Sequence, residues 1–430
     1  MSSLEYAKKA GMTLEEWKKA SKFSGMDLGW IIMCIGMAIG AGIVFLPLQV
    51  GLVGLWVYIV AAAIGYPILY QFQKLYIQIM ANSDKCEDFA GIISGYLGRN
   101  WGFFLGFLYF AFTTIVIFLY STALTNDSAS FLQTFGVTET LLSDNIFYGL
   151  AVICCLVLIA SQGEKLLFKV SSGMVLTKLL VIAFFGVVMV QYWNFGNIGE
   201  FPSVTYLIKN SIVMLPLTVL SITFFIGISP VVISYRAKSD NKVLAYYRSM
   251  RVMKIAFWTL WTVVVFYALS FNIAVGHEQA VAAYEANISS LAMAAKSMDG
   301  AAVRILSLVL NIFAVVTAFF SVFLSFRDSC YGIAMNVLLR YVKEESVNKK
   351  MIKYGISVFC VCVSWGAIAL NAPALTFTTL LSPLMGVLGC LMPVYLVMQT
   401  PQFKHYRDWK LCTISSIGIL LVISPFLAFS

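Results

Sequence analysis

Eleven apolar stretches, most of them long enough to cross a bilayer, determine what this chain can fold into. A spanning helix needs about 20 mostly apolar residues. The chain is 60% hydrophobic and 11% charged, whereas soluble domains carry about 25% charged residues. The pattern therefore predicts an all-α membrane protein with eleven transmembrane helices. The predicted spans are 28–50, 54–80, 101–125, 146–160, 166–192, 205–234, 250–275, 302–326, 352–371, 374–397 and 411–429.

The basic residues indicate how these spans are oriented. With the N-terminus inside, 25 of the 29 Lys and Arg residues fall in inner segments. The positive-inside rule then predicts a cytoplasmic N-terminus and a periplasmic C-terminus. Because topology explains the net charge of +9, we expect the lipid bilayer as partner and no nucleic acid. The inner segments are 1–27, 74–100, 161–169, 235–254, 327–353 and 398–410.

Motifs for catalysis or cofactor binding are missing from the sequence. The nine cysteines have no zinc-ligand spacing, and His277 and His405 lie in different predicted loops. No phosphate-binding loop or nucleophile elbow occurs. We therefore expect no enzyme activity, no cofactor and no metal, and a transport process driven by ion gradients. The sequence carries no sign of an oligomeric state.

Two spans contain residues that interrupt helices. The first carries three glycines and a proline in "GMAIGAGIVFLP", and the sixth carries Gly227, Ser229 and Pro230. Interrupted helices in equivalent, oppositely directed spans predict an inverted repeat with a binding site at its interface. Close helix packing through Gly36-x-x-x-Gly40 is the alternative explanation. The predicted units are a cytoplasmic segment 1–27, repeats 28–192 and 193–397 of five spans each, and an eleventh span in 398–430.

The first-span sequence resembles the signature of the amino acid/polyamine/organocation superfamily. The segments "LYFAFTTIVIFLYSTALTNDSASF", "SPVVISYR", "FLSFRDSCYGIAMN" and "LLSPLMGVLGCLMPVYLV" extend the resemblance along the chain. They are similar to the hydroxy and aromatic amino acid permeases, and most to bacterial serine transporters of the D-/L-serine type. The resemblance implies the LeuT-like fold, a place in the bacterial inner membrane and amino acid transport by alternating access.

A broken first span can solvate an amino acid zwitterion. The break exposes backbone N–H groups at one half-helix and C=O groups at the other, and glycines let a ligand approach the backbone. The predicted carboxylate donors are the amides of Ala41, Gly42 and Ile43. The predicted ammonium acceptors are the carbonyls of Ala38, Ile39 and Gly40.

The resemblance implies that the sixth span completes this site. Its ammonium acceptors would be the carbonyls of Phe224, Phe225 and Gly227. The two phenylalanine side chains either form a wall or a gate of the site or pack as ordinary core residues. Serine transporters of the family carry an Asn-His pair before Ser-Pro, where this chain has Gly227 and Ile228. The substrate preference is therefore expected to differ in detail.

A small hydroxylated substrate also needs a polar partner for its side chain. We favour Thr223 and Ser229 because they flank the expected break. Any of these hydroxyls can instead bond to a carbonyl of its own helix. The candidates are Thr113, Thr114, Thr223, Ser229, Thr317 and Ser321.

Lys178 is a charged residue deep inside the fifth span. It lies nine residues beyond Lys169, about 13 Å along a helix, so its amine cannot easily reach the membrane surface. A buried lysine can gain and lose a proton, and some proton-driven members of the superfamily resemble this arrangement. We therefore predict proton coupling by Lys178. The alternative is a structural tie between spans five and one.

A sodium ion is the rival coupling ion. Thr317 and Ser321 share one helix face, and with the carbonyls of Ala38 and Ile39 they could form an oxygen cage. The ammonium of Lys178 would repel such an ion. The sequence thus favours an importer of serine, or of a related small hydroxy amino acid, by proton symport. The alternatives are a sodium-coupled or aromatic amino acid permease and, from other classes, a non-transporting amino acid sensor or a membrane enzyme.

Overall fold

The computed structural model describes residues 2–84, 86, 89–161, 164–297, 300–338 and 347–429. Within these ranges the chain is helical or irregular and forms no strand. The helices are α1 (Ser3–Ala10), α2 (Leu14–Ala20), α3 (Gly25–Ala38), α4 (Ala41–Val53), α5 (Leu55–Asn82), α6 (Phe89–Leu97), α7 (Arg99–Thr134), α8 (Ile146–Ser161), α9 (Glu164–Met189), α10 (Val204–Ile222), α11 (Phe225–Lys238), α12 (Lys242–Ala274), α13 (His277–Glu285), α14 (Ser290–Ser297), α15 (Ala301–Leu338), α16 (Lys349–Leu370), α17 (Ala374–Met385), the π-helix η5 (Gly386–Leu391), α18 (Met392–Gln399) and α19 (Trp409–Ala428).

The long helices confirm a multi-span membrane protein. In the described ranges, nine helices are long and apolar enough to cross a membrane, counting α10 with α11 as one and α17 to α18 as one. The pair α3 and α4, bent by 44° at its junction, makes a tenth span if counted together. α8 is apolar but has only 16 residues, and it coincides with the short predicted span 146–160. The number eleven itself stays a prediction.

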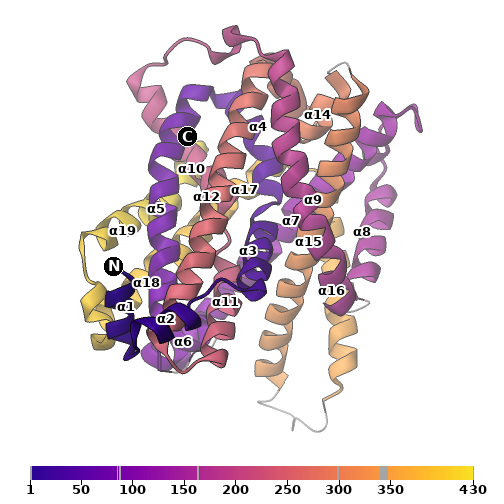
Figure 1. The fold of residues 1–430 in the computed structure, drawn as a ribbon. Helices are drawn as coiled ribbons and strands as arrows, with labels where there is room; N and C mark the ends of the chain where they lie inside the picture. The colour runs from indigo at the N-terminus through magenta and orange to yellow at the C-terminus, as the bar shows by residue number, and fades with distance from the viewer. Residues whose placement is uncertain are drawn as a thin grey trace.

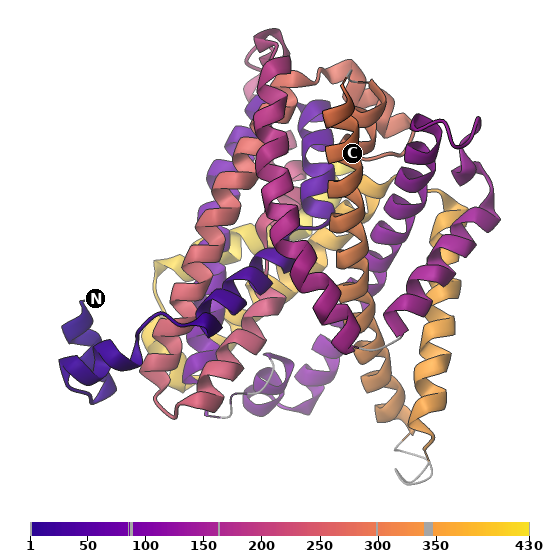
Figure 2. The same ribbon diagram turned by 45° about the vertical axis from the view of Figure 1, so that its right-hand side comes forward.

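Two groups of helices stand side by side in the molecule (Figures 1 and 2). In one group, α10 packs against α4 and α5, and α12 packs against α3, α5 and α11. In the other, α7 packs against α15, α16 and α17. α9 contacts α3 and α12 on one side and α15 on the other. The helix that carries Lys178 therefore bridges the two groups.

The first span breaks where the sequence predicts. α3 ends at Ala38 and α4 begins at Ala41. A Cβ at Gly40 would collide with the hydroxyl of Tyr120, and one at Gly42 would lie 2.7 Å from the Cα of Ser221 in α10. Gly42 thus lets two helix backbones approach, as the packing explanation expects, whereas Gly40 faces a polar side chain.

The sixth span breaks about one turn earlier than the sequence suggests. α10 ends at Ile222 and α11 begins at Phe225, so Thr223 and Phe224 form the break. Gly227 and Pro230, which we expected at the interruption, lie inside α11. The reason is that the ring of Pro230 crowds the carbonyl four residues earlier and so disfavours helix ahead of the proline rather than at the proline itself.

Candidate functional site

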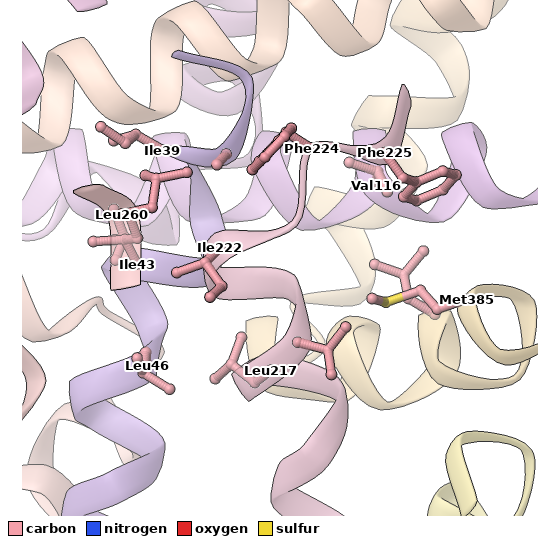
Figure 3. Close-up of a cluster of buried hydrophobic side chains, with 14 of the residues drawn as sticks. Ile39, Ile43, Leu46, Val116, Leu217, Ile222, Phe224, Phe225, Leu260 and Met385 are labelled. Atoms are coloured by element: carbon pink, nitrogen blue, oxygen red, sulfur yellow. The ribbon is translucent and has the colours of Figure 1, made fainter. Parts of the chain in front are cut away.

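The two breaks lie against each other. α10 packs on α4, and α11 contacts α3. Figure 3 shows Phe224 between Ile39 of the first break and Phe225 of α11. All three side chains are buried. The sequence identified both interrupted spans, and the structure brings them together.

The backbone of the first break offers donors and acceptors. The carbonyl of Gly40 accepts hydrogen bonds from the amides of Ile43 (3.1 Å) and Val44 (3.3 Å). The first two amides of α4, from Ala41 and Gly42, precede this bonding and are the ones that a helix start leaves for a ligand. Of the three predicted carboxylate donors, Ile43 therefore already has an intramolecular partner. The backbone of Ala41 and Gly42 fits the prediction.

Lys178 is held at the first break by three oxygen atoms. Its Nζ donates to the carbonyl of Gly36 (3.2 Å), the carbonyl of Ile39 (3.1 Å) and Oγ1 of Thr317 (2.8 Å). The side chain is 1% exposed. An ammonium has three donors, and here each has a neutral acceptor. Lys178 thus connects α9 and α15 to the end of α3, so its geometry serves both a tie between helices and a proton site.

Two of the four oxygens proposed for a sodium cage are engaged by this amine. The carbonyl of Ile39 and the hydroxyl of Thr317 both accept from Lys178. The same hydroxyl donates to the carbonyl of Phe313 in its own helix. The side chain of Ser321, the fourth predicted ligand, lies outside the described part of the structure. No group of three His, Cys, Asp or Glu residues that could hold a metal occurs among the described residues.

The sixth break carries a hydroxyl with open hydrogen-bonding capacity. Thr223 is 9% exposed, and its Oγ1 has no partner among the described residues. Buried polar atoms are normally hydrogen-bonded, so a buried hydroxyl with open capacity is a candidate contact for a ligand. A Cβ at Gly227 would lie 2.7 Å from Sδ of Met37 in α3, so the glycine faces the other broken span. Thr223 is the side chain of the site that most clearly lacks a partner.

Two other predicted hydroxyls already have partners. Ser229 is buried and hydrogen-bonded to the hydroxyl of Tyr76 in α5 (3.0 Å). Thr113 donates to the carbonyls of Tyr109 and Phe110 in its own helix (3.0 Å each). Thr113 therefore bonds to carbonyls of its own helix, as the alternative explanation expected. The hydroxyl of Ser229 is instead oriented by Tyr76 of α5.

A cavity of about 750 Å³ leads toward the sixth break. Its lining comes from α5, α6, α7, α11, α15 and the π-helix, and it includes Phe225 and Ser229 on α11. The lining also includes Asp328 of α15 and Ser94 of α6, and α6 lies at the lower end of the molecule in Figure 1. The cavity thus extends from the helix that follows the sixth break toward the end that holds α6.

Sequence reasoning missed Tyr120. This residue of α7 is buried, and its hydroxyl lies where a side chain at position 40 would be. It follows Thr113 by seven residues, which is two helical turns on one face. This spacing from a predicted site residue is the feature of the sequence that could have identified Tyr120. Tyr120 places a phenol beside the unwound backbone, where it can bind a ligand carboxylate or water.

Known proteins resemble the chain over nearly its whole length. A serine transporter of Escherichia coli O157:H7 is 54% identical over 427 residues, covering 99% of this chain and 96% of that protein. Serine transporter SdaC of E. coli K12 is 23% identical over 397 residues, covering 91% and 90%. Threonine/serine transporter TdcC of Escherichia fergusonii is 23% identical over 427 residues, covering 94% and 95%. No protein-family model matches the chain.

Proposed function

Since this chain belongs to the hydroxy amino acid permease family and is a multi-pass protein of the bacterial inner membrane, we propose that it imports serine, or a closely related small hydroxy amino acid, by proton symport. The relatives are named serine and threonine/serine transporters, which supports an amino acid substrate. The observation that carries the proposal is the buried amine of Lys178 at the break of the first span.

The proposal includes the full topology. Eleven spans, five plus five in an inverted repeat with one appended, place the N-terminus in the cytoplasm and the C-terminus in the periplasm. The repeats are 28–192 and 193–397. The basic residues support this orientation, and the opposed breaks support the repeat. On this topology the cavity beside α6 would face the cytoplasm, on the side where an importer releases its substrate.

Serine would bind between the two breaks. Its carboxylate accepts from the amides of Ala41 and Gly42 at the start of α4, where the helix dipole favours negative charge. Its ammonium would be bound by the carbonyls of Ala38 and Phe224; the latter accepts from the amide of Gly227 (2.9 Å) and keeps a second lone pair. Its hydroxyl bonds to Thr223, whose Oγ1 has no partner in the described structure. The orphan hydroxyl explains a preference for hydroxy amino acids over alanine.

Proton binding would act through Lys178. A protonated amine donates three charge-assisted bonds, to two carbonyls of α3 and to Thr317 of α15. A neutral amine donates only two and loses the charge, so its hold on α3 weakens. Protonation therefore changes how firmly α3 is bound to α9 and α15. Alternating access would move the group of α3, α4, α5, α10, α11 and α12 against the rest of the molecule.

The test is uptake of radiolabelled serine by proteoliposomes under an imposed pH gradient, with and without sodium. Lys178→Met and Lys178→Ala remove the amine, and Lys209→Met removes an exposed lysine of α10 as a matched control. We expect gradient-driven accumulation in the parent and in the control, independent of sodium, and none in either Lys178 variant. Accumulation that survives both changes would remove the proton role of Lys178. Accumulation that requires sodium would favour the rival ion.

A further inference from the structure

A buried carboxylate on α7 has no part in the proposed cycle so far. Asp127 lies in the last turns of α7, beyond the predicted span 101–125, and it is 0% exposed. One oxygen accepts from the amide of Ser289 (2.8 Å) and the other from Nδ2 of Asn311 in α15. Asn311 also donates to Oγ of Ser289 (3.1 Å). Across the described residues, the polar partners of the carboxylate are these two donors and the hydroxyl of Ser289.

Ser289 precedes α14, which together with α13 covers the end of the molecule opposite α6 (Figure 1). We name residues 277–297 the cap. Its loop makes further bonds to α7 and α17. Asn126 donates to the carbonyl of Asn287 (3.1 Å), and Oδ1 of Asn287 accepts from the amide of Ala374 (3.0 Å). The cap is thus bound to the helix group that contains α7, α15 and α17.

The cap also touches α4, the outer half of the broken first span. Oγ of Ser290 donates to the carbonyl of Val44, and the ring Nδ1 of His277 is 2.8 Å from the carbonyl oxygen of Gly51. These are hydrogen bonds to neutral carbonyls. Hydrogen bonds to a carboxylate are roughly twice as strong as bonds between neutral groups. The contact to α7 and α15 is therefore the stronger one, and the contact to α4 is the one that separates first.

We propose that Asp127 is a positioning residue of the transport cycle: its carboxylate fixes the cap to α7 and α15, so that Ser290 and His277 can hold α4 and close the path at this end. When the path opens, the cap stays with α7 and α15 and α4 leaves it. This inference rests on the proposed transport function, because it assigns Asp127 a role in closing one side of the same site.

The chain offers a charge-swap test. Asp127→Asn removes the charge and leaves one acceptor oxygen, which cannot keep both the bond from the amide of Ser289 and the bond from Nδ2 of Asn311 in the present arrangement. Asn311→Asp puts two carboxylates together. The double variant Asp127→Asn with Asn311→Asp restores one amide and one carboxylate, and Ser289 keeps an acceptor for its amide and for its hydroxyl.

Three measurements on the purified full-length chain decide the matter: hydrogen exchange of the amides of residues 288–296, serine affinity in detergent, and uptake by proteoliposomes. For each single variant we expect faster exchange in 288–296, and uptake reduced by about tenfold or more. Serine affinity should stay within about threefold of the parent, and the double variant should recover both exchange and uptake. A merely structural aspartate would lower affinity, folding yield and uptake together.

Parental exchange and uptake in Asp127→Asn would overturn the proposal, and so would a double variant as impaired as the single variants. If both single variants fail to fold, the double variant alone decides, because recovery of folding and uptake requires the pair. A parent that accumulates no serine would count against the proposed function. The exchange pattern of the cap would still test Asp127.

Discussion

The breaks of the first and sixth spans lie against each other but are built differently. The first is bent by 44° between its half-helices and is held by the amine of Lys178, whereas α10 and α11 together pass as one span. At the first break a glycine faces the backbone of another helix, and at the sixth a glycine faces a methionine side chain. At the first break an ammonium bonds to a carbonyl, and at the sixth the Thr223 hydroxyl has no described partner. The proposed function therefore assigns proton binding to the first break and substrate recognition to the sixth.

Gly42→Ala should give the largest loss of stability, because it places a methyl group in the tightly packed first break. The new Cβ would lie 2.7 Å from the Cα of Ser221 and 2.8 Å from the carbonyl oxygen of Leu220. Backbone atoms cannot turn aside, so we expect a loss of about 3 kcal/mol in stability, seen as a lower melting temperature of the purified protein. Gly29→Ala, which meets nothing within 4 Å, is the control and should melt like the parent. Equal melting temperatures of Gly42→Ala and Gly29→Ala would show that the first break is not rigidly packed at Gly42.

Thr317→Val tests whether the first break depends on its ammonium. The change removes one of three acceptors of Lys178 with little change in volume, which costs about 2 kcal/mol for a buried charged donor. Serine uptake should fall roughly thirtyfold at fixed pH. Thr113→Val removes a hydroxyl that bonds only to its own helix in the described contacts, and its uptake should stay near the parental rate. If both valine variants behaved alike, the oxygen set around Lys178 would not be functional.

The sequence located these breaks with unequal success, and the difference has a physical cause. The first was placed correctly because Gly40 lies in the break itself. The sixth was placed one turn late because Pro230 affects the residues before it rather than its own position. Lys178 was found as a charge inside an apolar run, but its acceptors come from α3 and α15, and no periodicity shows which helices meet.

The two missed residues of α7 show a second limit. Apolar character ends near residue 125, where Asn126 and Asp127 resemble a loop, yet α7 continues to Thr134. The carboxylate is tolerated because Ser289 and Asn311, distant in the sequence, supply its donors. The position of Tyr120 beside Gly40 could not be predicted either, because it depends on how α7 packs against the first break.

Thr223→Val sharpens the role of the sixth break. If the orphan hydroxyl bonds to the substrate hydroxyl, the variant should bind serine about tenfold more weakly, equivalent to about 1.4 kcal/mol, and should bind alanine as the parent does. Competition binding with both amino acids measures the ratio. Thr218→Val is the matched control on α10, because that hydroxyl donates to the carbonyl of Met214 in its own helix. An unchanged serine-to-alanine ratio in Thr223→Val would assign the substrate hydroxyl to another partner.

Gly227→Ala should give the smallest effect, although the predicted overlap is as short as at Gly42. The new Cβ would lie 2.7 Å from Sδ of Met37, which is the flexible part of a side chain that adapts to its surroundings. We expect a stability loss under about 1 kcal/mol, and Met37→Ala in the same chain should relieve it. The comparison of melting temperatures with Gly42→Ala is decisive, because both variants add one methyl group at one break. A stability loss as large as that of Gly42→Ala would mean that the sixth break is as rigid as the first. The proposed distinction between a rigid proton site and an adaptable substrate site would then be wrong.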